Sequence, residues 1–214
     1  MQLLGGLGNP GPAYAENRHN IGFMLVDCIH QHYSFSTWRS RDGALVSDGR
    51  VETTRLILVK PQQFMNKSGL PLAALMRFYK IPLENLIIAH DELDLKAGKL
   101  RVKTAGGHGG HNGLRDLGRH LGDGYCRLRI GIGRPEHANA DVSRWVLGDF
   151  SRTERGHWVE PLLRVMTDQL PLLLAGDCAG YATSIARLAP PPLPATSAQQ
   201  DDSESDAANN KETN

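Results

Sequence analysis

Cysteine is scarce in this sequence, and no two cysteines have the spacing of a redox or zinc motif. Cys28, Cys126 and Cys178 stand far apart among 214 residues. This usage argues against a disulfide framework and a cysteine-based zinc site, and it suits a reducing compartment. Long apolar runs are also missing, since runs such as LILV and LIIA are too short to span a membrane. The N-terminus has no basic region followed by an apolar run and a cleavage site, so we expect a cytoplasmic protein with no membrane partner.

The sequence also lacks the usual signatures of an enzyme that forms a covalent intermediate. It contains no G-x-S-x-G elbow, and none of its cysteines lies in a reactive context. Ser68 in NKSG could be a nucleophile, but we interpret it as part of a helix start. Metal ligands are plentiful at 90–92, His108 and His111, yet HGGH lies in a glycine-rich loop, where ligands would be poorly held. We therefore expect no metal and no other cofactor, with a metal-dependent hydrolase as an alternative.

A glycine pattern near the N-terminus has the spelling of a dinucleotide-binding loop but lacks what such a loop needs. Residues 6–11 read GLGNPG, which is G-x-G-x-x-G. Pro10 and Pro12 have no N–H to offer a pyrophosphate. The stretch QHYSFSTW, where an acidic residue would hold the ribose, contains no Asp or Glu. We therefore interpret the glycines as a strand-exit turn that presents Asn9, with no NAD site.

Acidic residues are scarce in the middle of the chain, where basic residues accumulate. The whole chain has a formal net charge of +1, but residues 96–135 hold nine Lys and Arg against two Asp. Five acidic residues lie instead in the tail, 189–214. A local excess of this size favours a polyanion partner, with nucleic acid as the leading candidate. Taken alone, this observation leaves open a non-catalytic RNA-binding module.

Apolar segments with strand-like and helix-like spacing alternate along the first 188 residues. Strands are expected at 2–7, 55–60, 85–95, 99–103 and 127–133, and helices at 20–33, 66–80, 114–121, 152–175 and 181–188. A polar, hairpin-like region follows the first helix, and Asn66 is expected to cap the second. This order predicts one α/β domain over residues 1–188, with a mixed, mostly parallel β-sheet flanked by helices on both faces. The acidic tail with its Pro and Ser residues, 189–214, is expected to be disordered.

Polar clusters follow three of the expected strands, where loops leave their carboxyl ends. They read GNPG, PQQFMN and HDELD, and in open α/β sheets ligands bind at that edge. A histidine there can act as a general base on water, while a carboxylate on its other ring nitrogen stabilises the imidazolium that forms. Asparagine amides can stabilise a developing oxyanion. A base and a water molecule suffice to cleave an ester, whose leaving group departs more readily than an amine.

Six motifs occur in the same order as in the bacterial peptidyl-tRNA hydrolase family. They are GLGNPGPAYAENRHNIGF, KPQQFMNKSG, HDELDL, GGHGGHNGLRDL, RLRIGIGRP and VLGDF. The resemblance covers residues 1–188, with departures from the usual pattern at Gln63 and at Lys96-Ala97. It implies a single α/β domain and a monomeric enzyme. Such an enzyme hydrolyses the ester between a peptide, or an N-blocked aminoacyl group, and the 3′-terminal ribose of tRNA, recycling peptidyl-tRNA released from stalled ribosomes.

The resemblance also implies roles for individual residues of the reaction centre. His19 matches the family's catalytic base, and Asp91 matches the carboxylate that supports it. Asn9 matches the residue that distinguishes a blocked aminoacyl group from a free amine. Other positions match residues that line the cleft for the peptide and the terminal adenosine; they are Tyr14, Phe64, Met65, Asn66 and Asn112.

Two further positions match basic residues that hold tRNA phosphate. They are Lys103 and Arg129, and both lie in the basic segment 96–135. The charge count and the resemblance therefore point to the same partner, the tRNA part of peptidyl-tRNA. His108 and His111 are given no chemical role.

Overall fold

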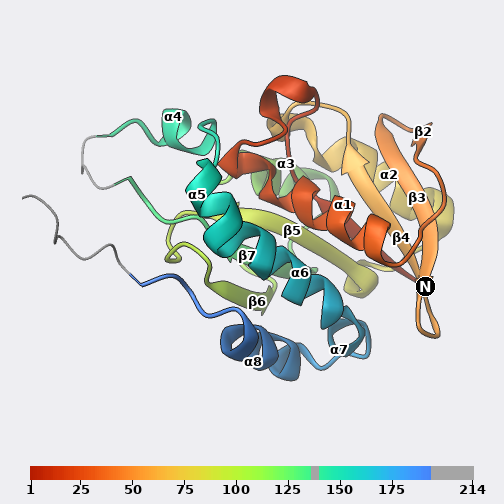
Figure 1. Cartoon of the computed structure of the whole chain (residues 1–214). Coiled ribbons are helices and arrows are strands. Elements are labelled where there is room, and N and C mark those ends of the chain that lie inside the picture. Colours follow the sequence, from red (N-terminus) through yellow and green to blue (C-terminus); the bar gives the residue numbers. More distant parts are fainter. Residues whose placement is uncertain (136–139, 194–214) are drawn as a thin grey trace, which may run out of the picture.

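The computed structural model describes residues 1–135 and 140–193. Its centre is a seven-stranded sheet with the strand order β2-β3-β4-β1-β5-β7-β6 (Figure 1). The strands are β1 (Gln2–Gly6), β2 (Arg39–Arg41), β3 (Ala44–Val51), β4 (Thr54–Pro61), β5 (Leu86–Glu92), β6 (Leu100–Thr104) and β7 (Cys126–Gly131). The central strands β4, β1, β5 and β7 are parallel, while β2 and β3 at one edge and β6 at the other form antiparallel pairs. The predicted mixed, mostly parallel sheet is confirmed.

Helices cover both faces of this sheet (Figure 1). α1 (Ile21–His32), α6 (Glu160–Asp168) and α8 (Cys178–Leu188) contribute to the core on one face, and α2 (Gly69–Tyr79) and α3 (Asn112–Leu121) to the core on the other. Successive side chains of a strand point to opposite faces. Leu4 of β1 accordingly belongs to the first core and Leu3 to the second, and both are fully buried.

The helix expected over 152–175 consists of several consecutive segments. α5 (Arg152–Glu154) continues into a π-helical stretch at Arg155–Val159, then into α6, and α7 (Leu170–Leu174) follows. Pro161 and Pro171 lie in the first turns of α6 and α7. Proline has no N–H for an i→i−4 bond and is tolerated only in a first turn, so each proline begins a new segment.

Asn66 does not cap α2, contrary to the expectation. It lies in a short 3-10 turn, Met65–Lys67, and its side chain is exposed. The Gly69 N–H at the start of α2 instead donates to Asp116 Oδ2 of α3 at 2.7 Å. Ser68 is fully buried, and its Oγ donates to the Met65 carbonyl at 2.8 Å. Ser68 thus belongs to the helix start, as interpreted, while the cap itself comes from another helix.

Gly6 of GLGNPG and Gly22 of α1 allow three elements to approach closely. A Cβ on Gly6 would lie 2.3 Å from the carbonyl oxygen of Gly22 in α1, and one on Gly22 would lie 2.3 Å from the carbonyl oxygen of Ala89 in β5. No side chain fits in these spaces, so β1, α1 and β5 can meet here only through glycine. Gly11 adopts a φ of 108°, which glycine tolerates best.

Within residues 1–135 and 140–193, no helix has both the length and the apolar character needed to cross a lipid bilayer. The disorder predicted for 189–214 falls, from residue 194 onward, outside the described residues.

Candidate active site

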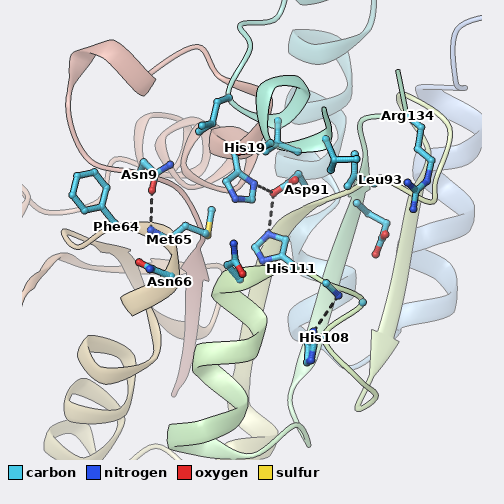
Figure 2. A pocket seen from close by; sticks show the side chains of 18 residues that line it. Asn9, His19, Phe64, Met65, Asn66, Asp91, Leu93, His108, His111 and Arg134 are labelled. Atoms are coloured by element: carbon cyan, nitrogen blue, oxygen red, sulfur yellow. Dashed lines mark hydrogen bonds and ion pairs between the residues drawn. The ribbon is translucent and has the colours of Figure 1, made fainter. Parts of the chain in front are cut away.

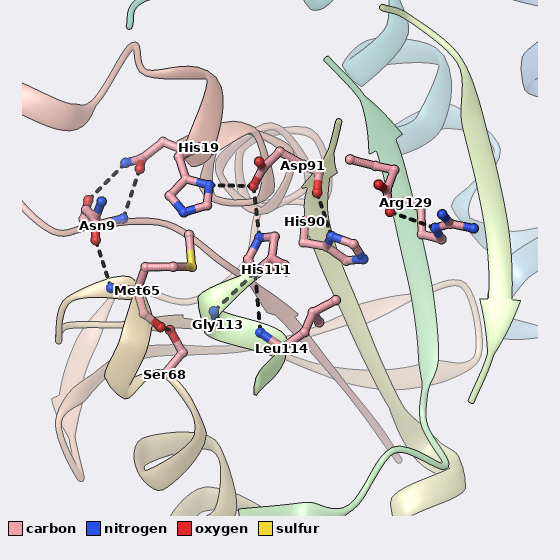
Figure 3. Close-up of polar contacts among 12 residues, drawn as sticks. Asn9, His19, Met65, Ser68, His90, Asp91, His111, Gly113, Leu114 and Arg129 are labelled. Atoms are coloured by element: carbon pink, nitrogen blue, oxygen red, sulfur yellow. Dashed lines mark hydrogen bonds and ion pairs between the residues drawn. The ribbon is translucent and has the colours of Figure 1, made fainter. Parts of the chain in front are cut away.

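Three segments that are distant in the sequence meet around Asn9, just beyond the end of β1. The Asn9 backbone N–H donates to Asn20 Oδ1, and Asn20 Nδ2 donates to the Asn9 carbonyl, both at 2.9 Å. Asn9 Oδ1 accepts from the Met65 N–H at 2.8 Å (Figure 3). Because its oxygen is engaged in this way, the amide Nδ2 is the group that Asn9 can offer to a ligand.

His19 and Asp91 are joined by a direct hydrogen bond. His19 lies in a 3-10 turn, Arg18–Asn20, immediately before α1, and Asp91 lies near the end of β5. His19 Nδ1 is 2.8 Å from Asp91 Oδ1 (Figure 2). A carboxylate can only accept, so Nδ1 carries the hydrogen and Nε2 keeps its lone pair. Figure 3 shows Nε2 directed toward the side of the site where Asn9 and Met65 lie.

Asp91 has a second imidazole partner, His111, for which no role was expected from the sequence. His111 Nε2 is 3.0 Å from the same oxygen, Asp91 Oδ1. His111 is also the N-cap of α3, where its Nδ1 accepts the N–H groups of Gly113 and Leu114 at 3.1 and 3.3 Å. An accepting Nδ1 places the hydrogen on Nε2, which therefore donates to Asp91. The signal in the sequence was the position of His111 directly before an amphipathic helix.

The surroundings of Asp91 keep its carboxyl ionised. Burial acts to raise the pKa of this carboxyl, which is 3% exposed, but His111 and His19 outweigh burial through charge and hydrogen bonds and hold the pKa well below its usual range. His90 behaves differently, because burial and the neighbouring His111 lower its pKa to about 3. The neutral His90 donates its Nδ1–H to the Asp91 carbonyl at 2.7 Å. Three imidazoles thus hold Asp91, two at its carboxylate and one at its main chain.

His19, Asp91 and His111 also have the composition of a metal site. Their ligand atoms lie within 4.8 Å of one another. A metal ion on His111 Nε2 would move the ring hydrogen to Nδ1, where it would face the N–H groups of Gly113 and Leu114. It would also replace both hydrogen bonds to Asp91 Oδ1. The arrangement of donors and acceptors therefore favours a hydrogen-bonded triad over a metal centre.

A cleft of about 550 Å³ opens above this triad (Figure 2). Most of the predicted site residues line it, namely Asn9, His19, Phe64, Met65, Asn66, Asp91 and Asn112. Tyr14 is not among the lining residues but meets the Phe64 ring edge-on, with 6.4 Å between the ring centroids. Asn112 Oδ1 accepts from Arg115 Nη1 at 3.2 Å, so Asn112, like Asn9, can offer its amide nitrogen.

One wall of the cleft comes from α4 (Val142–Val146), a helix that no sequence pattern indicated. We call it the α4 wall; its lining residues are Val142, Ser143, Val146 and Leu147. A helix of five residues is too short to show a helical period in its apolar residues. The Trp145 Nε1–H donates to the Gly133 carbonyl at 2.9 Å and ties α4 to the segment that follows β7. The cleft thus combines an apolar wall with the polar groups of the triad.

Lys103 and Arg129 line a smaller, adjoining pocket of about 80 Å³ rather than the cleft. Glu92 lines both spaces, and its Oε2 accepts from Arg129 Nε at 2.9 Å. The register of β6 and β7 pairs Arg101 with Arg129 and Lys103 with Arg127. Because residues two apart in a strand and opposite each other across strands share a face, these four basic residues lie on one face of the sheet beside the cleft, the basic face, where Arg101 and Lys103 are exposed and Arg127 is buried.

Comparisons with known proteins agree with these features. The family model described as peptidyl-tRNA hydrolase matches residues 3–190. A peptidyl-tRNA hydrolase of Rhodospirillum centenum is 49% identical over 192 residues, which cover 90% of this chain and 84% of the relative. One of Dinoroseobacter shibae is 48% identical over 192 residues, covering 89% and 81%. The crystal structure of peptidyl-tRNA hydrolase from Acinetobacter baumannii is 38% identical, with a TM-score of 0.81 and coverage of 89% of this chain and 96% of that one.

Proposed function

The chain belongs to the peptidyl-tRNA hydrolase family, and from this premise we propose that His19, supported by Asp91, is the base of its reaction. The protein is an ester hydrolase that acts on peptidyl-tRNA. The hydrogen bond of 2.8 Å between His19 Nδ1 and Asp91 Oδ1 supports the proposed base most directly, because it leaves Nε2 as an acceptor beside the cleft.

In the proposed reaction, His19 Nε2 takes a proton from a water molecule as the water oxygen attacks the ester carbonyl carbon. The imidazolium that forms is stabilised by the ionised Asp91. The amide nitrogens of Asn9 and Asn112 donate hydrogen bonds to the carbonyl oxygen as negative charge develops on it. The bond between the carbonyl carbon and the ribose oxygen then breaks, and His19 returns the proton to that oxygen. The products are a peptide with a free carboxyl group and a tRNA with a free ribose hydroxyl.

The experiment that tests this function compares two esters of the same tRNA. N-acetyl-aminoacyl-tRNA is expected to be cleaved, and free aminoacyl-tRNA at least about 100-fold more slowly, because burying an unpaired ammonium beside the donating amide of Asn9 is unfavourable. Replacing Asn9 with alanine is expected to narrow this ratio. Release of labelled amino acid measures both rates. Equal rates in the wild type would remove the discriminating role of Asn9, and cleavage of neither ester would contradict the proposed function.

Removing metal ions is expected to leave hydrolysis unchanged. Among the residues that the structure describes, the group that could hold an ion is His19, Asp91 and His111, and hydrogen bonds to Asp91 Oδ1 already join its members. Initial rates on N-acetyl-aminoacyl-tRNA are measured for untreated enzyme, for enzyme dialysed against EDTA, and for dialysed enzyme after addition of Zn²⁺. The untreated and the dialysed enzyme are expected to have the same rate. A loss of activity on chelation that Zn²⁺ restores would favour the metal-dependent alternative.

We further propose that the basic face holds tRNA phosphate through Lys103 and Arg129. Glu92 engages the Nε of Arg129, so the terminal nitrogens of that guanidinium remain for a phosphate. Lys103→Ala and Arg129→Ala are each expected to weaken tRNA binding and to reduce the slope of log affinity against log salt by about one unit. Arg55→Ala is the matched control, because Arg55 pairs with Asp48 and lies on β4, which is not next to the strands β6 and β7 that carry the basic face. A slope identical to that of the wild type in both test variants would mean that neither side chain contacts phosphate.

Translation produces the substrate peptidyl-tRNA in the cytoplasm, so we propose that the enzyme works there. We also propose that it is a monomer, and sedimentation at micromolar concentration tests this oligomeric state. A non-catalytic RNA-binding role would account for the basic face. It would leave the hydrogen-bonded pair of His19 and Asp91 in the cleft without a purpose, so we favour the hydrolase.

A further inference from the structure

The turn that carries His19 is held by three consecutive side chains, each of which reaches a different part of the molecule. Asn20 bonds to the main chain of Asn9, and His19 bonds to Asp91. The third, Arg18, points away from this chemistry toward the segment that follows α4. Arg18 is only 7% exposed, which is unusual for an arginine and requires compensating partners.

The Arg18 guanidinium has those partners on the chain beyond α4. Nη1 donates to the Asp149 carbonyl at 2.5 Å, and Nη2 lies 2.9 Å from both carboxylate oxygens of Glu154. The guanidinium carbon lies 4.0 Å from the ring centroid of Trp145, which belongs to α4, and 5.3 Å from that of Phe150. A charged, planar group held by a carboxylate and stacked on two rings is strongly fixed in position.

Main-chain hydrogen bonds join the same two segments. The Arg18 N–H donates to the Gly148 carbonyl at 2.9 Å, and the Phe150 N–H donates to the Glu16 carbonyl at 2.9 Å. Residues 16–18 and 148–150 therefore lie side by side. The His19 turn is thus attached to the end of α4 through both the main chain and the Arg18 side chain.

We propose that Arg18 is a positioning residue that fixes the distance between His19 and the α4 wall. The proposal rests on the proposed function, in which the acyl group occupies the cleft. Val142 and Leu147 of the α4 wall are 38% and 42% exposed, so their apolar side chains are available to a peptide. A longer peptide fills more of the cleft and contacts more of this wall. Arg18 therefore places the wall so that a bound peptide holds its ester bond against His19.

The test compares the effect of the same substitutions on a short and a long acyl group. Arg18→Lys keeps the charge but loses the planar fork that meets Glu154 and stacks on Trp145. Glu154→Gln keeps the shape of the partner and removes its charge. For a tRNA carrying an apolar tetrapeptide, each variant is expected to lower kcat/KM about tenfold, with a fall in kcat as well as a rise in KM, because the ester bond is placed less well against His19. For N-acetylglycyl-tRNA the change is expected to stay within about twofold, because that group contacts little of the α4 wall.

A matched control separates this role from a general loss of stability. Arg55→Lys alters an exposed arginine that pairs with Asp48 on β3 and β4, outside the segments that carry His19 and the α4 wall, and it is expected to change neither substrate's kinetics. Equal fold-losses on both substrates, or no loss on either in both test variants, would overturn the proposal. Failure of the proposed function would look different, since the wild-type enzyme itself would then cleave neither substrate.

Discussion

Replacement of His19 by alanine is expected to lower the rate of N-acetyl-aminoacyl-tRNA hydrolysis by about a thousandfold, the scale of a lost general base. His111, the other imidazole bonded to the Asp91 carboxylate, does not take its place, because Asp91 holds His111 by Nε2 and the α3 cap holds its Nδ1. Binding of tRNA is expected to persist, since the basic face lies in a separate pocket. Single-turnover rates and a filter-binding measurement on the same preparation give both quantities.

His108 provides the matched control for this substitution. It lines the same cleft, but its Nδ1 accepts only the Gly110 N–H within its own loop, at 3.1 Å. His108→Ala is therefore expected to change the rate by less than about threefold, because the His108 side chain bonds to its own loop and to neither His19 nor Asp91. If His108→Ala lost as much activity as His19→Ala, the effect would belong to the cleft in general and not to one base.

Asp91→Asn is expected to lower the rate by about a hundredfold, less than the loss of His19, because Nε2 and the water molecule remain. The substitution removes the negative charge that stabilises the His19 imidazolium. The amide oxygen can take the place of Oδ1, which accepts both ring N–H groups, but as a neutral acceptor it holds the His19 ring less firmly. An unchanged rate at pH 7 would remove Asp91 from the mechanism.

The direction of the Asp91 pKa shift also predicts how the wild-type enzyme responds to pH. The folded-state pKa of Asp91 lies well below the value of about 3.9 expected in the unfolded chain. Its contribution to stability is therefore fully present above about pH 4 and is lost as the pH falls further. Asp91 therefore stays ionised from pH 7 to pH 5, and any activity that the wild-type enzyme loses in this range does not come from protonation of Asp91. An infrared band of a protonated carboxyl group that appears between pH 7 and pH 5 in the wild type and is missing in Asp91→Asn would contradict this.

Much of the fold could be predicted from periodicity, because a buried strand and an amphipathic helix leave different spacings of apolar residues. The sheet of mixed direction with helices on both faces is confirmed. Helix boundaries were less accurate where one proline decided the geometry, as at Pro161 and Pro171. The cap of α2 could not be predicted, because Asp116 reaches Gly69 from a different helix.

In the candidate site, too, local sequence patterns predicted some residues, while features that depend on tertiary contacts could not be predicted. His19 and Asp91 were selected from motifs, and the structure brings them into contact, while their catalytic roles stay predictions. His111 was given no chemical role from the sequence, because its contact with Asp91 depends on where α3 begins relative to β5. The α4 wall was not predicted, because its place beside the cleft depends on contacts with Arg18 and Gly133, which no local sequence pattern indicates.

The most direct test of His19 as the base is to supply imidazole to the His19→Ala variant. The ring removed by the substitution leaves a space beside Asp91, and free imidazole entering it can take the proton from water in place of the side chain. The rate of N-acetyl-aminoacyl-tRNA hydrolysis is expected to rise with the concentration of neutral imidazole, while His19→Ala alone stays nearly inactive. A His19→Ala enzyme that hydrolyses this ester at the wild-type rate without imidazole would contradict the account.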